Sequence, residues 1–511
     1  MSIPESRAAV VARHIFPNVS RLSVPAIASE EPTSTSASGS AGSSGSAEMI
    51  HSDVVIVGGG VVGATLAYVL GKKGFKVIVV ERDLSEPDRL IGELLQPGGV
   101  NALTQLGLAE TMEGIDACKI QGYSVFMDNQ RLQLKYPIVK GKPAIGRAFH
   151  HGRFVQNLRS SARGTTGVSL IAGTVTRLVE EGSRITGLLF RDADGKQKRI
   201  KSAVTIVCDG SGSVFRSKIS DAQPVVRSHF VGILMEGANE HLPFPWHGHV
   251  ILAKPTPVLA YPISSTECRV LVDINGKLPS ISNGDMTAYL LTEIAPQLPT
   301  EIKPYFVSAV QKGRIRSMPN KTMSGKPYVV SGAILLGDAF NCRHPLTGGG
   351  MTVAFNDVLT FANLIRSRKD LTDLKRLEKI MSAFYSKRKP YASTINILAN
   401  ALYSVFSAQD DPSLPIMRKA CFDYFKLGGI AVSGPIGLLS GLKPYPSMLI
   451  FHFFSVALYG VARLLFPFPT PARVFMAFRL LRAATLIVKP LIASESLQCW
   501  DAPSLTNVCS R

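Results

Sequence analysis

The chain has 511 residues, of which 46% are hydrophobic and 18% are charged, and its formal net charge is +19. This length allows two or more hydrophobic cores, and the basic charge favours an anionic membrane surface over nucleic acid, because no aromatic and basic nucleic-acid-binding module is present. The seven cysteines lack C-x-x-C spacing, so the sequence predicts neither a disulfide framework nor a zinc site, and no metal site is expected.

The first 48 residues differ in composition from the rest of the chain. Ser, Thr, Ala and Gly fill residues 33–46, which is typical of a flexible linker that cannot bury a core. Residues 8–16 are too short, and too interrupted by Arg13, for a signal peptide or a membrane span. Basic residues leave a transit peptide as an alternative, although Glu5 argues against it.

A strand, a glycine-rich turn and a helix follow this linker. Residues 53–57 are an apolar strand candidate, residues 58–63 carry the pattern G-x-G-x-x-G, and residues 64–70 are a helix candidate. A second apolar strand, residues 76–80, ends in Glu81. This combination predicts an adenine-dinucleotide site, and the alternative is a glycine-rich turn that binds no ligand.

Each glycine of the pattern has its own role. Gly58 permits the tight turn, Gly60 lets a diphosphate approach the backbone, and Gly63 allows the helix to pack closely on the strand. Glu81 follows about 20 residues later, where an acidic side chain holds ribose hydroxyls.

Short apolar runs then alternate with turns. One of them, residues 203–210, is a strand that ends in Asp209-Gly210. Alternating sheets and returning helices imply a discontinuous architecture, in which a substrate domain is inserted between pieces of another domain. The other strand candidates are residues 169–172, 185–190, 230–235, 249–252, 257–262 and 269–273.

The segment 333–358 reads as a buried strand, an acidic turn, a glycine run and a helix. Asp338 in the turn is placed to accept hydrogen bonds from sugar-like hydroxyls. Residues 348–350 are glycines that leave backbone N–H groups free at the N-terminus of a helix beginning near Met351. Such a terminus attracts negative charge. A reduced flavin has ribityl hydroxyls and a negatively charged pyrimidine edge, so this segment predicts a flavin site.

From Leu371 onward, helical periodicity dominates. One apolar face has two interpretations: a helix packed on the flavin-binding domain, which is favoured, or a wall of a substrate tunnel. The residues of this face are Ile395, Leu398, Ala399, Leu402, Val405 and Phe406.

Two apolar runs near the C-terminus predict a helical hairpin. Residues 447–462 contain no Lys, Arg, Asp or Glu, whereas residues 472–492 carry a basic face. A membrane span needs about 20 uninterrupted apolar residues, and a basic amphipathic helix lies in the interface. We therefore expect a hairpin, from about residue 447 to about residue 493, that embeds in one leaflet. A single span and two ordinary helices that cover a soluble core are the alternatives.

The order of G-x-G-x-x-G, Asp-Gly and Gly-Asp resembles the FAD-dependent monooxygenases built on the para-hydroxybenzoate hydroxylase plan. The resemblance implies an α/β fold with a Rossmann-type FAD-binding domain, an inserted β-sheet substrate domain and a C-terminal helical, membrane-associated region. The similarity runs from about residue 53 to about residue 493. Five blocks narrow it to the squalene monooxygenases, also called squalene epoxidases: residues 81–89, 92–99, 146–154, 343–351 and 421–429.

The domain boundaries that follow place the FAD-binding domain in three parts and the substrate domain in two. The expected division is a linker at 1–48, the FAD-binding domain at 49–115, 148–222 and 325–370, the substrate domain at 116–147 and 223–324, and a helical region at 371–511.

The resemblance also implies a reaction. With FAD, O2 and electrons from NADPH, squalene is converted to (S)-2,3-epoxysqualene in sterol and triterpenoid biosynthesis. A separate NADPH–cytochrome P450 reductase is the expected electron donor, which the lack of a second G-x-G-x-x-G favours. The implied location is the endoplasmic reticulum membrane, with membrane lipid as a partner and the catalytic domain facing the cytosol. Relatives often carry an N-terminal membrane helix and residues 1–48 show none, so the C-terminal hairpin is expected to anchor the chain.

A hydrocarbon substrate needs no general base, and the sequence shows no paired-carboxylate or nucleophile constellation. Its site must exclude water, and its pocket is expected to be long and apolar. The alternatives are an FAD-dependent hydroxylase of another polar or aromatic substrate and a non-catalytic flavin-fold membrane protein.

The site residues are implied by the same resemblance. Tyr123 is expected to organise the active site through a hydrogen bond with Gln96, and the alternative is a packing tyrosine. Arg89 is expected to lie near the cofactor, and the alternative is that it is only a charged residue on the surface. The expected cofactor-binding residues are Gly58, Gly60, Val61, Val62, Gly63, Glu81, Arg82, Arg89, Leu94, Arg159, Val175, Asp338, Gly349 and Met351.

Two neighbouring residues of the flavin segment need separate mention. His344 is a candidate base, but a structural hydrogen bond in the loop is the favoured interpretation. Cys342 stands where a methionine is expected in this family, and the smaller side chain is expected to alter the shape of the pocket and to put the choice of substrate in doubt.

Overall fold

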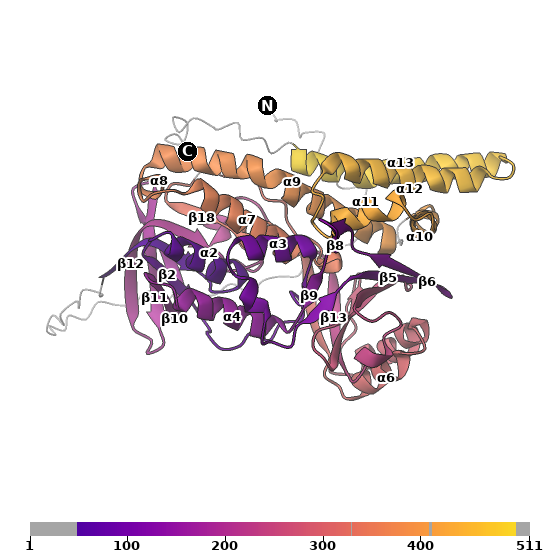
Figure 1. The fold of residues 1–511 in the computed structure, drawn as a ribbon, viewed down its shortest axis with the longest axis horizontal. Helices are drawn as coiled ribbons and strands as arrows, with labels where there is room; N and C mark the ends of the chain where they lie inside the picture. Colours follow the sequence, from indigo (N-terminus) through magenta and orange to yellow (C-terminus); the bar gives the residue numbers. More distant parts are fainter. Residues whose placement is uncertain (1–48, 329, 408–410, 497–511) are drawn as a thin grey trace, which may run out of the picture. The chain divides into compact units, whose positions relative to one another are not determined.

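The computed structural model describes residues 49–328, 330–407 and 411–496. The predicted linker, residues 1–48, lies outside the described residues. The strands form two main sheets, one six-stranded and one seven-stranded, and helices pack against both (Figure 1). The fold therefore has the predicted α/β class.

The six-stranded sheet has a parallel core in the spatial order β10–β2–β1–β12–β18. β11 is antiparallel to both of its neighbours, β10 and β12. Parallel strands that are buried on both faces consist of nearly continuous apolar runs, which is why the sequence reveals them. The strands are β1 (Met49–Val57), β2 (Val77–Glu81), β10 (Val168–Glu181), β11 (Arg184–Asp192), β12 (Gln197–Val207) and β18 (Ala333–Leu335).

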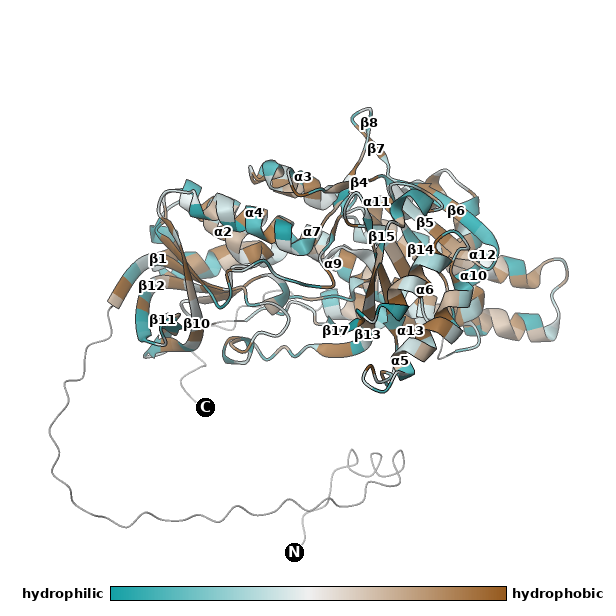
Figure 2. Ribbon diagram, turned by 90° about the horizontal axis from the view of Figure 1, so that it is seen from below, coloured by the Kyte–Doolittle hydropathy of each residue, from teal (hydrophilic) through white to brown (hydrophobic). Residues whose placement is uncertain are grey.

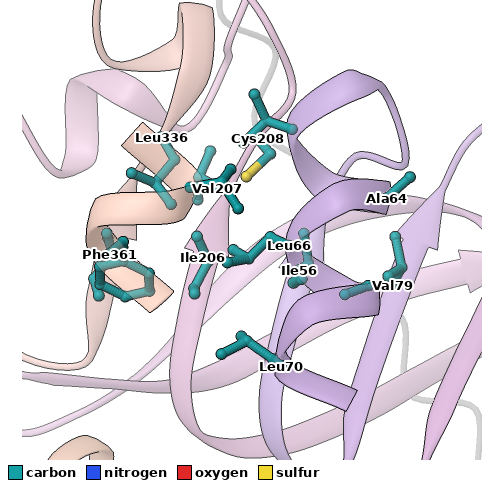
Figure 3. Close-up of a cluster of buried hydrophobic side chains, with 14 of the residues drawn as sticks. Ile56, Ala64, Leu66, Leu70, Val79, Ile206, Val207, Cys208, Leu336 and Phe361 are labelled. Atoms are coloured by element: carbon teal, nitrogen blue, oxygen red, sulfur yellow. The ribbon is translucent and has the colours of Figure 1, made fainter. Parts of the chain in front are cut away.

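Helices α2 (Val61–Lys72) and α7 (Gly350–Leu364) share one hydrophobic core with this sheet. Figure 3 shows Leu66 of α2 beside Ile56 and Ile206 of the sheet. All three side chains are fully buried, and burial of each stabilises the fold by about 2 kcal/mol. Helices α3 (Pro97–Gln105) and α4 (His151–Arg163) contribute further side chains to this core.

The seven-stranded sheet has the order β17–β13–β16–β15–β14–β5–β6. Only β14 and β5 are parallel within it, and the other neighbours are antiparallel. The strand candidates between residues 230 and 273 all lie in this sheet, and α5 and α6 contribute to the core on it. The elements are β5 (Gly122–Met127), β6 (Gln130–Lys135), β13 (Val225–Glu236), β14 (His247–Ile251), β15 (Val258–Pro262), β16 (Glu267–Ile274), α5 (Asp285–Tyr289), α6 (Lys303–Gln311) and β17 (Arg316–Thr322).

Two small sheets complete the strands. They comprise β3 (Leu94–Leu95), β9 (Gly146–Ala148) and β4 (Cys118–Ile120) in one sheet, and β7 (Ile138–Val139) and β8 (Lys142–Pro143) in the other.

The C-terminal region is helical, as predicted. α12 and α13 pack side by side and project beyond the two sheets (Figure 1). α12 is the one helix in the described ranges that is long and apolar enough to cross a membrane. The helices are α8 (Lys369–Thr372), α9 (Leu374–Ser407), α10 (Leu414–Lys426), α11 (Ile430–Leu439), α12 (Pro446–Leu465) and α13 (Pro471–Ser496).

Candidate cofactor and substrate site

A cavity of about 700 Å³ is lined by residues of both main sheets. One part of its wall is formed by the β1–α2 turn, the end of β2, the end of β12 and the segment that leads into α7. Another part is formed by β14, β15 and β16 of the seven-stranded sheet. The cavity thus joins the predicted dinucleotide motif to the inserted sheet.

The glycines of the β1–α2 turn differ in what surrounds them. Gly58 has φ +94°, and a Cβ there would lie 2.8 Å from the Cys208 carbonyl oxygen. A Cβ on Gly63 would lie 1.9 Å from the Gly58 carbonyl oxygen. Gly60 faces open space, with nothing within 4 Å of a Cβ. The turn therefore fits a diphosphate at Gly60, whereas Gly58 and Gly63 allow the close backbone packing.

Glu81 and Arg159 hold this turn from the side. The Gly59 N–H donates to Glu81 Oε2 at 2.6 Å, and Arg159 Nε donates to the Gly59 carbonyl oxygen at 2.8 Å. Arg159 Nη1 donates to the Ser85 carbonyl oxygen at 2.9 Å. Burial lowers the pKa of Arg159, although Glu81 opposes that shift. Glu81 still lines the cavity, so its carboxylate fits a role toward ribose hydroxyls.

The segment before α7 provides another part of the wall. Asp338 is exposed and lines the cavity, and Gly337 before it has φ +65°, with Val62 2.8 Å from a Cβ at that position. Met351 also lines the cavity. A Cβ on Gly349 would lie 2.5 Å from Ile395, so Gly349 serves contact with α9.

Arg343 is a part of this wall that the sequence did not reveal. Its Nη2 donates to the Asn341 backbone oxygen and to Asn341 Oδ1, both at 2.9 Å, and its Nη1 donates to the Gly350 oxygen at 3.3 Å. Burial lowers the pKa of Arg343. A buried cation beside the N-terminus of α7 adds to the attraction for an anionic ring edge.

Tyr123 and Gln96 are joined as expected. Gln96 Nε2 donates to the Tyr123 hydroxyl at 2.5 Å and to the Thr347 carbonyl oxygen at 2.9 Å. Gln96 Oε1 accepts from the Tyr136 hydroxyl at 2.6 Å. Tyr123 lines the cavity, whereas Gln96 is fully buried behind it. Burial raises the pKa of Tyr123 far above its ordinary value, so its hydroxyl stays protonated.

A buried ion pair that the sequence did not reveal lies at the same wall. Arg269 Nη2 donates to Glu93 Oε1 at 2.8 Å, Arg269 Nε donates to Glu93 Oε2 at 3.0 Å, and the Tyr261 hydroxyl donates to Glu93 Oε2 at 3.2 Å. Burial raises the pKa of Glu93, and Arg269 opposes that rise. Glu93 stands within the block 92–99, but its partner is 176 residues away, so only the fold brings them together.

His344 has the structural role that was favoured for it. It is fully buried, and its Nδ1 accepts the Leu346 N–H at 3.3 Å. Its Nε2 lies 3.0 Å from Ser228 Oγ, and its ring stacks on Tyr403 at 3.9 Å between centroids. These contacts hold the loop before α7, and His344 does not line the cavity.

Cys342 corrects an expectation. Its backbone pairs with Met323 in both directions, at 2.8 and 3.0 Å, and its side chain is buried with Ala222 and Met323. This pairing turns the thiol away from the cavity, so the smaller side chain does not shape the wall. Burial raises the pKa of Cys342 to about 12, which makes its thiol unreactive.

The predicted site residues divide into two groups. Gly63, Gln96 and Gly349 lie behind the wall. The residues that line the cavity are Gly58, Gly60, Val61, Val62, Glu81, Arg82, Arg89, Leu94, Tyr123, Arg159, Val175, Asp338 and Met351.

One part of the wall is apolar. No group of three or more metal-ligating side chains is found within the residues that the structure describes. None of the six residues of the predicted apolar face of α9 lines the cavity, so that face packs rather than forming a tunnel. The apolar part of the wall includes Ile91, Leu94, Val250, Leu259, Leu271 and Leu346.

Comparisons with known proteins agree with this geometry. Residues 201–476 match the family model described as squalene epoxidase, and residues 53–87 match that of FAD-dependent oxidoreductases. Squalene epoxidase 1 of Arabidopsis thaliana is 50% identical over 88% of this chain and 85% of its own length. Squalene monooxygenase of Mus musculus is 43% identical over 90% of this chain and 81% of its own length. The solved structure of the flavin-dependent brominase Bmp2 is 20% identical, covers 80% of this chain and 99% of its own, and superposes with a TM-score of 0.65, which shows a shared fold.

Proposed function

The chain belongs to the squalene epoxidase family, and on this premise we propose that it inserts one oxygen atom of O2 into squalene with FAD as its cofactor. The observation that carries the proposal is a single cavity that runs from the open Gly60 turn, past the N-terminus of α7, to the apolar wall of β14–β16. The glycine turn suits a dinucleotide, and the apolar wall suits a hydrocarbon.

The residues of the cavity fit FAD. The N–H groups of Val61 and Val62 would hold the diphosphate, and Glu81 and Arg82 the adenosine end. Asp338 would bind the diphosphate or ribityl region, and the Met351 N–H the pyrimidine ring. Arg89, Leu94, Arg159 and the backbone of Val175 would lie near the cofactor.

FAD supplies the activation of O2, and the protein supplies binding, orientation and exclusion of water. Squalene offers no polar group, so it would be held by contact area along the apolar wall. Tyr123 keeps its proton, and its hydroxyl is held by contacts with Gln96, Thr347 and Tyr136, which would fix its ring beside the reacting region. No side chain has to remove a proton from the alkene.

Two polar groups in the substrate part of the cavity already have hydrogen-bond partners. Glu93 is paired with Arg269 and Tyr261, and His249 Nε2 accepts the Phe244 N–H. A polar or aromatic substrate would have to displace these bonds, at a cost of about 1–3 kcal/mol for each buried group left without a partner. This favours squalene over the alternative of a hydroxylase for polar substrates.

We also propose that electrons reach FAD from NADPH through a separate cytochrome P450 reductase, and that the product is the (S)-2,3-epoxide. The division into FAD-binding, substrate and helical domains given above belongs to the same proposal. It is supported by the separate hydrophobic cores of the two main sheets.

The hairpin of α12 and α13 is proposed to embed in one leaflet of the endoplasmic reticulum membrane, with the catalytic region in the cytosol. Phe466 and Phe468, at the turn between the helices, are 77% and 75% exposed. Figure 2 shows hydrophobic stretches along both helices. Exposed apolar side chains of this kind mark a membrane or protein contact, and the arginines of α13 suit the interface.

The test is a reconstituted reaction. Purified protein, FAD, NADPH, cytochrome P450 reductase and squalene in detergent are incubated under 18O2, and the product is analysed by mass spectrometry. A product heavier than squalene by one 18O atom is expected. Flavin turnover that yields only hydrogen peroxide would overturn the proposal, and omission of the reductase tests the electron donor.

A further inference from the structure

Glu495, in the last described turn of α13, is buried although it carries a carboxylate; only 7% of it is exposed. Three donors reach it: Ser324 Oγ at 3.0 Å, Ser393 Oγ at 3.2 Å and Asn396 Nδ2 at 2.9 Å. Ser393 and Asn396 belong to α9, so the hairpin is fixed to the catalytic region by a specific polar contact as well as by apolar packing.

The contact continues toward the cofactor segment. Asn396 Nδ2 also donates to Asn341 Oδ1 at 3.2 Å. The same oxygen accepts from Arg343 Nη2 at 2.9 Å and from Arg388 Nη2 at 3.2 Å. The amide nitrogen of Asn341 donates to the Met323 oxygen at 2.8 Å, which fixes the orientation of the side chain.

Arg343 and Arg388 both form hydrogen bonds with residues of α7. Arg343 donates to the oxygen of Gly350, the first residue of α7, and lines the cavity. Arg388 forms a two-point ion pair with Asp357 of α7, with both distances 2.9 Å. Two hydrogen-bonded side chains, Asn396 and Asn341, therefore separate Glu495 from the arginine at the cofactor wall.

Among the buried members of this network the charges balance only when α13 is in place, and the exposed Asp338 adds a further negative charge that acts on Arg343. Arg343 and Arg388 carry two positive charges, and Asp357 and Glu495 carry two negative charges, with each residue at most 8% exposed. Loss of one member of a buried ionic network leaves an uncompensated charge, which destabilises its surroundings strongly. The surroundings here include the segment 341–351.

We propose that Glu495 is a positioning residue that couples the docking of α13 to the geometry of the cofactor-binding segment 341–351. This deepens the proposed function, on which it rests, because it makes firm FAD binding depend on the membrane hairpin being docked. A purely structural role for Glu495 would anchor α13 and leave the segment 341–351 unchanged.

The test compares Glu495→Ala with the wild-type protein. FAD is removed and titrated back by flavin fluorescence, and hydrogen–deuterium exchange is followed in peptides that cover residues 340–351. Glu495→Ala is expected to raise the dissociation constant of FAD about tenfold and to speed exchange in those peptides both with and without FAD. Glu495→Gln keeps the shape of the side chain and one acceptor oxygen. Its dissociation constant for FAD and its exchange rates are therefore expected to fall between those of the wild-type protein and Glu495→Ala.

Ser494→Ala is the matched control, because Ser494 stands on the same turn, is exposed and bonds only the Leu491 oxygen in its own helix. Asn396→Ala breaks the same chain while leaving α13 unaltered, so it decides the question if Glu495→Ala cannot be purified in folded form. The double variant of Glu495→Ala and Asn396→Ala is expected to raise the dissociation constant of FAD no further than the more affected single variant does. Both substitutions break the same chain of hydrogen bonds.

A dissociation constant within about twofold of wild type and unchanged exchange at 340–351, in both Glu495→Ala and Asn396→Ala, would overturn the proposal. The proposed function is judged separately on the wild-type protein. If that protein makes no epoxide while the effect on FAD and exchange is seen, the function fails and the coupling stands. If it makes epoxide normally and the variants show no effect, the coupling fails and the function stands.

Discussion

The Gln96 amide has a hydrogen-bond partner at each end. Its nitrogen serves the Tyr123 hydroxyl and the Thr347 oxygen, and its oxygen receives the Tyr136 hydroxyl. Thr347 immediately precedes the glycines that lead into α7. The amide therefore links the substrate wall to the cofactor wall, and a change at Tyr123 is felt at both.

We predict that Tyr123→Phe lowers the yield of epoxide per NADPH about tenfold, because the buried hydrogen bond between Tyr123 and Gln96 is lost and the Tyr123 ring is less firmly positioned. The measurement is the ratio of epoxide to hydrogen peroxide. Tyr305→Phe, in α6, is the control and should leave the ratio unchanged. An unchanged ratio in Tyr123→Phe would mean that this tyrosine only packs.

Arg159 acts on the cofactor turn through a planar fork. It binds the Gly59 and Ser85 oxygens from one side chain, and a lysine cannot reproduce that geometry. We predict that Arg159→Lys weakens FAD binding about tenfold, measured by flavin fluorescence titration. Arg163→Lys, one turn later on α4 and exposed, serves as control. If Arg159→Lys and Arg163→Lys bound FAD with equal affinity, the role of Arg159 in holding the cofactor turn would be contradicted.

Single residues were predictable where local spacing defines their role. The glycines at 58, 60 and 63 could be assigned because each acts within one strand–turn–helix unit. Arg343 and Glu93 could not, because their roles depend on Gly350 and Arg269, which folding brings to them. Cys342 was misjudged because the bridge to Met323, not the sequence, sets the direction of its side chain.

At the scale of elements, strands were easier to predict than their lengths. β13–β16 coincide with apolar runs, but β10 continues to Glu181, well past the predicted 169–172, and exposed residues interrupt the apolar run along its outer half. β5 and β6 belong to the same sheet as β13–β16 although a long stretch of sequence separates them. Pairing at that range leaves no periodic signal in either segment.

The hairpin allows a prediction at this scale. Phe466→Ser combined with Phe468→Ser is expected to reduce binding to phosphatidylcholine vesicles about tenfold, since two large exposed side chains would no longer be buried in lipid. Co-sedimentation measures the bound fraction. Ile138→Ser on β7, which is 72% exposed, is the control outside the hairpin. A larger loss in that control would place the membrane contact at β7–β8.

At the scale of the whole molecule, the segment just before β3 of the small three-stranded sheet is tied both to the seven-stranded sheet and to α4. Glu93, just before β3, pairs with Arg269 on β16, and His151 of α4 donates from Nδ1 to the Gly92 oxygen. His151 is thus buried near this segment. Burial lowers its pKa to about 4, and Arg89 and Arg159 add to the shift.

This histidine makes stability depend on pH. Its pKa is about 4 in the folded chain and 6.5 without burial, so the unfolded chain binds the extra proton. The stabilisation is fully present above pH 6.5 and is lost as pH falls toward 4. Between pH 7 and 5 we expect a loss of about 2 kcal/mol from His151 in the free energy of unfolding.

Urea unfolding at both pH values measures this loss. His151→Asn, which keeps an amide donor for Gly92, should show a loss smaller by about 2 kcal/mol. His51→Asn on β1 is the exposed control and should behave as wild type. If the free energy of unfolding depended on pH in the same way in His151→Asn as in the wild-type protein, His151 would not be the cause of the loss.

The order in which the strands leave the ribosome follows from the topology. The seven-stranded sheet is complete at Thr322, whereas the six-stranded sheet lacks β18 until Leu335 has been synthesised, and the wall at Met351 comes later still. Until then residues 205–207 of β12, which later pair with β18, present an unpaired edge, which is a template for aggregation in a nascent chain. The cofactor cavity therefore cannot be complete until Met351 has been synthesised.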